Sequence, residues 1–184
     1  YTLGELSMYQ GEWEEATRYL DEAVIVAQHL GADAMIREVE GLRAERDILR
    51  GEFDEAMARL EPLLETQGWE EHLNFLLPLA WAYLEVGDEE AASSAATKAA
   101  AEAAQQKSPV GQIETLRMRG IIASRQGQWQ DAEDSFKQAL RRSKATERSV
   151  GWGIGGNRLG ANANVRPVIG SAGVNGPARK NHGR

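Results

Sequence analysis

The sequence contains no cysteine, and this absence excludes a disulfide framework, a thiolate metal site and a cysteine nucleophile. It has no apolar run near the ~18 residues that a membrane-spanning helix requires, and Tyr1 does not begin a charged-then-apolar signal segment. We therefore expect a cytoplasmic protein that makes no contact with a membrane. An initiator methionine is also lacking, so we expect the 184 residues to be a fragment of a longer protein.

Residue patterns that would indicate catalysis or metal binding are missing too. The three histidines, His29, His72 and His182, share no metal-ligand spacing with one another or with a carboxylate. Adjacent acidic residues are common, but neighbours on a helix point in different directions and make poor proton-sharing pairs. No Ser–His–Asp series includes a nucleophile elbow. We therefore expect no enzyme activity, no catalytic residue, no cofactor and no bound metal.

Charge and glycine are distributed unevenly along the chain. Residues 1–144 contain 15 Lys or Arg and 27 Asp or Glu, a net charge of −12, whereas residues 145–184 contain 6 basic residues and one acidic residue, a net charge of +5. Ten glycines lie in the first segment and nine in the much shorter second one. The composition predicts a folded domain over residues 1–144 and a different, tail-like segment over residues 145–184.

The first segment contains an internal repeat. Four short stretches align, and the glycines that open them are 40, 36 and 40 residues apart: GEWEEA from Gly11, GEFDEA from Gly51, GDEEAA from Gly87 and GQWQDA from Gly127. Five residues after each glycine stands an alanine, and further apolar residues follow it at i+4 and i+7, which is the spacing of one helix face. These alanines are Ala16, Ala56, Ala92 and Ala132.

Each repeated glycine is predicted to separate two helices. A second helical pattern precedes it, glycine suits a left-handed helix cap, and acidic residues follow at once, where the positive end of the next helix dipole favours them. Gly31, Gly68 and the SPVG stretch at residues 108–111 are predicted to be the turns between units. The sequence therefore predicts four units, each built as helix, glycine turn, helix.

The repeat also predicts how the two helices of a unit pack. Antiparallel helices approach closely only where a contact residue is small, which explains the alanines. Trp13, Phe53 and Trp129, two residues after their turns, are expected to bury large areas beside them, about 2–3 kcal/mol each. Pro78 lies within the first helix of the third unit, where a proline removes a hydrogen bond, so we expect a kink or a later helix start.

The repeat resembles the tetratricopeptide repeat family. The resemblance rests on LAWAYLEVGDEEAA at Leu79–Ala92 and RGIIASRQGQWQDAEDSFKQAL at Arg119–Leu140, and it covers residues 1–144. It implies an all-α fold: a right-handed α-solenoid of about four helical hairpins. The usual tyrosine before the turn is present only as Tyr83, and the repeats are longer than the usual ~34 residues. Such long, Glu- and Ala-rich repeats resemble those in sensor regions of large bacterial signalling ATPases and MalT-type transcriptional regulators.

The resemblance also implies that the first helix of each unit lines a concave groove. Trp81 with neighbouring Asn, Glu and Arg residues could hold a peptide by aromatic packing and charge-assisted bonds. Alternatively, Trp81 packs between repeats and the charges form a solvated face. The candidate groove residues are Glu45 and Ile48 in the second unit; Asn74, Leu77, Trp81 and Glu85 in the third; and Arg117, Ile121 and Arg125 in the fourth.

Three functions are compatible with this interpretation. The first is a protein-interaction scaffold or regulatory segment that binds a peptide or helix of a partner protein. The second is a small-ligand sensor region of a bacterial transcriptional regulator or signalling ATPase, and a purely spacing role is a third. The net charge of −12 argues against direct binding of nucleic acid by the repeats, since phosphate contacts require cations. The pattern sets neither the partner nor the oligomeric state.

Residues 145–184 are rich in Gly, Asn, Ala and Arg and have no apolar periodicity, so we expect a disordered tail. Three interpretations stay open: a flexible linker, a weakly nucleic-acid-attracting arm, or non-native sequence from a frameshifted or truncated gene. The abrupt loss of every repeat feature favours the last. A GxGxxG string at residues 151–156 lacks the preceding strand and the later acidic residue of a dinucleotide site, and we expect it to be a chance match.

Overall fold

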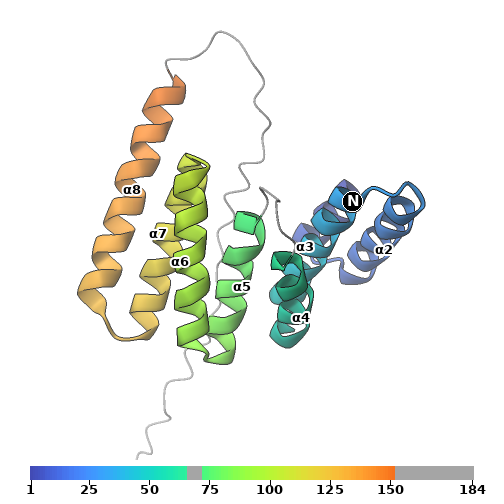
Figure 1. Cartoon of the computed structure of the whole chain (residues 1–184), viewed down its shortest axis with the longest axis horizontal. Helices are drawn as coiled ribbons and strands as arrows, with labels where there is room; N and C mark the ends of the chain where they lie inside the picture. The colour runs from blue at the N-terminus through green and yellow to red at the C-terminus, as the bar shows by residue number, and fades with distance from the viewer. Residues whose placement is uncertain (66–71, 152–184) are drawn as a thin grey trace, which may run out of the picture. The chain divides into compact units, whose positions relative to one another are not determined.

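A computed structural model describes residues 1–65 and 72–151, with side chains described up to residue 146 (Figure 1). These residues form eight helices and no strand, which confirms the all-α class. The predicted turn at Gly68 and residues 152–184 of the predicted tail, with most of the GxGxxG string, lie outside the described residues. The helices are α1 (Thr2–Gln10), α2 (Trp13–His29), α3 (Asp33–Arg50), α4 (Phe53–Leu64), α5 (His72–Val86), α6 (Glu89–Gln105), α7 (Pro109–Arg125) and α8 (Trp129–Gly151).

The helices form four hairpins, each closed by one of the repeated glycines. All four glycines have a left-handed backbone, with φ between 72° and 87°. At Gly87 the backbone N–H donates to Leu84 O at 3.3 Å, and the Asp88 N–H donates to Tyr83 O at 2.9 Å, which satisfies two carbonyls at the end of α5. The same pair of bonds recurs at Gly11, Gly51 and Gly127. The predicted glycine turns are therefore confirmed.

The turns between hairpins use different residues. Gly31 has φ 61° between α2 and α3, as the sequence predicts. Between α6 and α7 the left-handed residue is Lys107, with φ 50°. Ser108 then caps α7, because its hydroxyl accepts a hydrogen bond from the N–H of Gly111 at 3.0 Å. Residues 109–111 belong to α7, so the predicted turn lies before the SPVG stretch and overlaps it only at its first residue.

Successive helices pack against one another along the chain, and the first helices α3, α5 and α7 also contact each other in sequence. This is the order expected of a tetratricopeptide-like solenoid. Two small positions bring the helices of a hairpin together. One is the predicted alanine, which is buried in all four hairpins. The other lies seven residues before the turn glycine and was missed; it is occupied by Gly4, Ala44, Ala80 and Gly120.

Where the second small position is a glycine, the two helices of the hairpin leave no room for a larger residue. A Cβ atom built on Gly4 would lie 2.9 Å from Leu20 Cγ, and one on Gly120 would lie 2.6 Å from the Phe136 ring. Leu20 and Phe136 occupy the same repeat position, nine residues after their turn glycines. The first helix thus carries a small residue where the second helix carries a large side chain. This complementarity sets how closely the two helices of the hairpin approach each other.

Three expectations require correction or completion. Trp129 is 71% exposed, whereas Trp13 and Phe53 are half-buried, so the large burial expected at Trp129 is wrong. The physical reason is that α8 is the last described helix, and no following hairpin among the described residues covers it.

Helix α5 begins at His72 and continues through Pro78, so a later start is also wrong. Helix α8 continues to Gly151, past the predicted boundary at residue 144, and that boundary stays a prediction.

Candidate functional site

Three of the predicted groove residues pack into one hydrophobic cluster. Leu77 and Trp81 of α5 and Ile121 of α7 are half-buried against a core that α5, α6 and α7 form together. The buried members of that core include Ala80, Ala96 and Met118. The contact agrees with the interpretation in which Trp81 packs between repeats, and it places a partly exposed indole ring at the junction of the third and fourth hairpins.

Three of the four charged groove candidates are held in ion pairs. Arg125 of α7 donates to the Glu85 carboxylate of α5 at 2.6 Å, which joins two successive first helices. Arg117 donates to Glu114 one turn earlier on the same helix. Asn74 is exposed near the start of α5. Such partly exposed pairs contribute only about 0–1 kcal/mol to stability, so their main effect is to fix the side chains of this face in one geometry.

Glu45 and Ile48 lie on α3 in a different environment. Ile48 packs against a core cluster that includes Ala44, Leu60 and Phe75. Glu45 is largely buried, and this burial, with a smaller contribution from the negative charge of Glu5 on α1, raises the pKa of its carboxyl to about 7. Glu45 is therefore a titrating group near neutral pH rather than a permanently charged groove residue.

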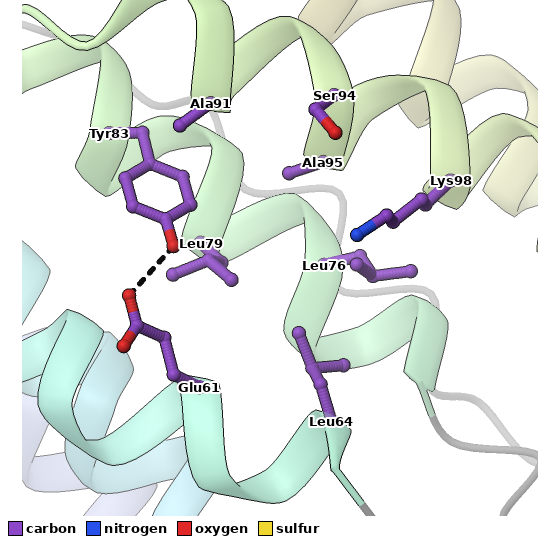
Figure 2. A pocket seen from close by; sticks show the side chains of 9 residues that line it. All are labelled: Glu61, Leu64, Leu76, Leu79, Tyr83, Ala91, Ser94, Ala95 and Lys98. Atoms are coloured by element: carbon purple, nitrogen blue, oxygen red, sulfur yellow. Dashed lines mark hydrogen bonds between the residues drawn. The ribbon is translucent and has the colours of Figure 1, made fainter.

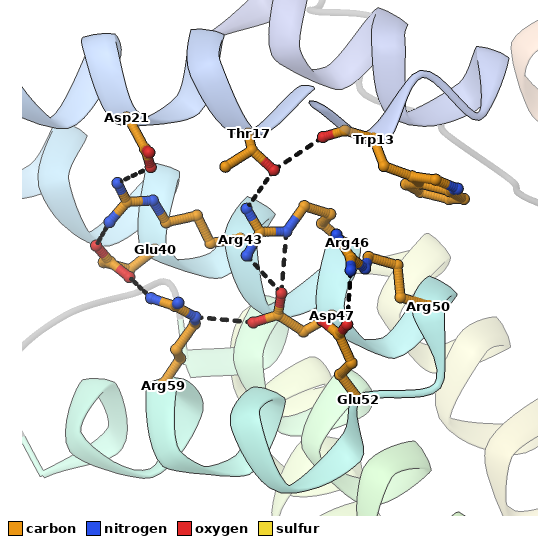
Figure 3. Close-up of polar contacts among 10 residues, drawn as sticks. All are labelled: Trp13, Thr17, Asp21, Glu40, Arg43, Arg46, Asp47, Arg50, Glu52 and Arg59. Atoms are coloured by element: carbon orange, nitrogen blue, oxygen red, sulfur yellow. Dashed lines mark hydrogen bonds and ion pairs between the residues drawn. The ribbon is translucent and has the colours of Figure 1, made fainter. Parts of the chain in front are cut away.

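A polar network that the sequence analysis missed crosses α2, α3 and α4 (Figure 3). Its centre is Asp47, whose side chain is 1% exposed. One carboxylate oxygen accepts hydrogen bonds from Arg46 Nε at 2.9 Å and Nη2 at 2.6 Å, and the other accepts from Arg59 Nε at 2.8 Å. Asp47 stands where the third hairpin has Tyr83, and this replacement, with Arg43, Arg46 and Arg50 close to it in the sequence, is the signal that could have revealed the network.

The network continues on both sides of Asp47. Arg46 also donates to the hydroxyl of Thr17 on α2 at 3.0 Å, which ties the first hairpin to the second. Arg59 of α4 donates to Glu40 at 3.0 Å, and Glu40 in turn accepts from Arg43, which also pairs with Asp21 of α2. Every carboxylate in this chain of contacts is matched by a guanidinium, so the arrangement is structural and leaves no exposed cation cluster for an anionic ligand.

A small open cleft of about 200 Å³ lies between α4, α5 and α6 (Figure 2). Tyr83 donates a hydrogen bond to Glu61 at 2.7 Å across its mouth. Partial burial and this bond raise the pKa of Tyr83 to about 12, so the phenol stays protonated at neutral pH. Ser94 and Lys98 of α6 supply the other polar groups, and Leu76 and Leu79 form the apolar floor.

The two histidines within the described residues each lie near a local partner. His29 bonds the Ile25 carbonyl at 2.8 Å at the end of α2, and His72 Nδ1 lies 3.7 Å from a Glu102 carboxylate oxygen. In the part of the chain that the structure describes, no three His, Asp or Glu side chains are grouped so as to hold a metal ion. None of the described helices combines the length and the apolar character that crossing a bilayer demands.

Comparison with known proteins gives one result on family. No curated protein matches the chain. A family model described as tetratricopeptide repeat matches residues 2–33 and 113–147. These two stretches correspond to the first hairpin, α1 and α2, and to most of the fourth, α7 and α8. The match supports the tetratricopeptide repeat family, which the repeated glycine and alanine pattern predicts.

Proposed function

We propose that this chain is a protein-interaction scaffold, or a regulatory segment of a larger protein, whose binding surface is the face of α3, α5 and α7 that carries the candidate groove residues. The observation that carries the proposal is the junction of α5 and α7. There the partly exposed Trp81 and Ile121 lie on the same pair of helices as the Glu85–Arg125 ion pair. Such a surface suits an extended peptide or an amphipathic helix with apolar residues and charges of both signs.

The mechanism is binding without chemistry. A preformed helical surface loses little conformational entropy when a partner docks, so modest contacts suffice for affinity. Tetratricopeptide repeats generally mediate protein–protein interaction, and two stretches of the chain match that family. The net charge of −12 over residues 1–144 favours a protein partner over nucleic acid.

The test is a matched pair of double variants. Peptides are selected from a random display library on the wild-type chain, and their dissociation constants are measured by fluorescence anisotropy. Trp81→Ala with Arg117→Glu is expected to weaken binding at least about tenfold, since aromatic and arginine side chains dominate such interfaces. Trp129→Ala with Arg141→Glu makes the same chemical changes on the exposed surface of α8 and should leave affinity unchanged.

Circular dichroism must show that both double variants keep the wild-type helical content. Equal loss of affinity in the two double variants, or no loss in either, would place the binding surface elsewhere and reject the proposal. A library that yields no binder to the folded chain would count against a peptide-binding role as well.

The cleft between α4, α5 and α6 favours a second candidate, a small-ligand sensor. Its polar groups, the Tyr83–Glu61 pair and Lys98, lie around a volume that suits a small metabolite. Under this candidate one member of a metabolite library should raise the melting temperature by about 2–8 °C at saturation. Lys98→Ala should abolish the rise. A complete screen without any shift would remove this candidate.

A further inference from the structure

The cleft between α4, α5 and α6 is lined at the repeat positions that carry the polar network between α2, α3 and α4 (Figure 2 and Figure 3). Arg59 follows its turn glycine by eight residues, and the residue at that position in α6 is Ala95. Arg43 precedes the same glycine by eight residues, and the residue at that position in α5 is Leu79. Two guanidinium side chains thus fill the earlier junction, whereas the later junction keeps an open space of about 200 Å³.

One carboxylate of the network has an acidic counterpart at the cleft. Asp21 and Glu61 both lie ten residues after their turn glycines. Asp21 is paired with the guanidinium of Arg43. Within the described residues, Glu61 has one hydrogen-bond partner, the hydroxyl of Tyr83 at 2.7 Å, and this phenol is uncharged at neutral pH. Glu61 therefore borders the cleft without the cation that balances Asp21.

Lys98 supplies the opposite charge on the other side of the cleft. It is the one basic residue of α6, and it extends from that helix toward the cleft, with Glu61 on the facing wall (Figure 2). No ion pair within the described part of the chain includes Lys98. Ser94 lies one turn earlier on the same face of α6 and also lines the cleft. The cleft thus presents an unbalanced carboxylate on α4 and an unbalanced ammonium on α6.

We propose that this cleft binds a small zwitterion of the amino-acid class, with its amino group on Glu61 and its carboxylate on Lys98. The inference rests on the second candidate function, the small-ligand sensor, and names the class of its ligand. The amino group supplies to Glu61 the positive charge that Arg43 supplies to Asp21 in the preceding junction. The carboxylate accepts charge-assisted hydrogen bonds from the Lys98 ammonium.

The remaining surface of the cleft suits an apolar side chain on the ligand. Leu76 and Leu79 form the floor between the two charged groups, and Ala91 and Ala95 line the wall on α6. A volume of about 200 Å³ holds a molecule of roughly six to ten non-hydrogen atoms. Leucine has this size, both charges and a branched apolar side chain, so it is the probe for the test.

The test compares leucine with three molecules that each lack one of its features. Isocaproate lacks the amino group, isoamylamine lacks the carboxylate, and glycine lacks the apolar side chain. Dissociation constants are measured at pH 7 by NMR titration of the full chain, with shifted amides expected in α4, α5 and α6. Leucine should bind at least about tenfold more tightly than isocaproate or isoamylamine, since each analogue leaves one charged group of the cleft unpaired. Glycine should bind more weakly than leucine.

Two variants at exposed positions assign the two ends of the ligand. Lys98→Met removes the cation and keeps an unbranched side chain, so it should remove the advantage of leucine over isoamylamine. Glu61→Gln removes the negative charge at nearly constant shape, so it should remove the advantage over isocaproate. Lys137→Met and Glu133→Gln make the same chemical changes at exposed positions of α8 and should leave all four affinities unchanged.

The possible results separate this inference from the sensor candidate. Absence of leucine binding, or binding no tighter than that of either singly charged analogue, overturns the zwitterion assignment. A preference for leucine that survives both Lys98→Met and Glu61→Gln overturns it too, because the ligand then binds elsewhere. If the metabolite screen yields a Lys98-dependent ligand that is not a zwitterion, the sensor candidate stands and this inference is rejected. A screen without any shift removes the sensor candidate itself.

Discussion

Replacing Asp47 with alanine is expected to lower the free energy of unfolding by about 3–5 kcal/mol, because it removes one partner of a buried ion network. The carboxylate accepts three hydrogen bonds from Arg46 and Arg59. Arg46 is itself buried, so its guanidinium would keep its charge and lose its closest counter-charge. The Thr17 hydroxyl, its remaining partner in the network, carries no charge to balance it.

The measurement is urea unfolding followed by circular dichroism. Asp21→Ala provides the matched control, since Asp21 belongs to the same network but its side chain is half exposed, and it should cost about 1 kcal/mol or less. Asp47→Asn retains an acceptor oxygen without the charge, so its loss of unfolding free energy should lie between those of Asp47→Ala and Asp21→Ala. If Asp47→Ala costs no more than the ~1 kcal/mol expected for Asp21→Ala, the buried centre of the network does not stabilise the fold.

Replacing Glu45 with glutamine is expected to make the chain more stable at pH 8 but to change stability little at pH 5. Burial raises the pKa of Glu45 to about 7, above the ordinary value of 4.5. The folded state therefore holds this proton more tightly than the unfolded state. Its contribution to stability is complete below about pH 4.5 and is lost as pH rises through 7. The change over this window is on the order of 1–3 kcal/mol.

The quantity to measure is the difference in unfolding free energy between Glu45→Gln and the wild type at the two pH values. Glutamine has nearly the same shape and does not titrate, so this difference should grow by about 1–3 kcal/mol from pH 5 to pH 8. Glu55→Gln, at an exposed position on α4, should give the same difference at both pH values. A constant difference for Glu45→Gln would show that this carboxyl is hydrated in the folded chain.

The local features of the fold were predictable because they depend on residues close in sequence. A left-handed turn requires glycine at Gly11, Gly51, Gly87 and Gly127, and the alanine five residues later marks the buried side of the next helix. Helical periodicity then fixes which face is apolar. These signals can be interpreted without knowing how the hairpins pack against one another.

The features that were missed depend on contacts between distant residues. The residues near Asp47 in the sequence do not indicate that Arg46 donates a hydrogen bond to Thr17 of α2. The burial expected at Trp129 was wrong as well: its side chain is 71% exposed on the last described helix. The later helix start expected from Pro78 was wrong, since α5 begins six residues before it, and the alternative of a kink stays a prediction.

The candidate site was predictable as a set of positions and not as a set of interactions. The spacing placed Leu77, Trp81 and Ile121 on the first helices, and the structure brings them to one cluster. It gave no sign that Arg125 pairs with Glu85 forty residues earlier, or that Glu45 is buried. Charge pairing and burial are set by the packing of one hairpin on the next.

The central claim is that the face of α3, α5 and α7 binds a protein partner. Hydrogen exchange of the chain with and without a library-selected peptide tests it most directly, because it maps the contact without any substitution. The account predicts slowed exchange concentrated in segments from α5 and α7, around Trp81 and Arg117. Protection confined to the second helices α2, α4, α6 and α8, with α5 and α7 unchanged, would contradict it.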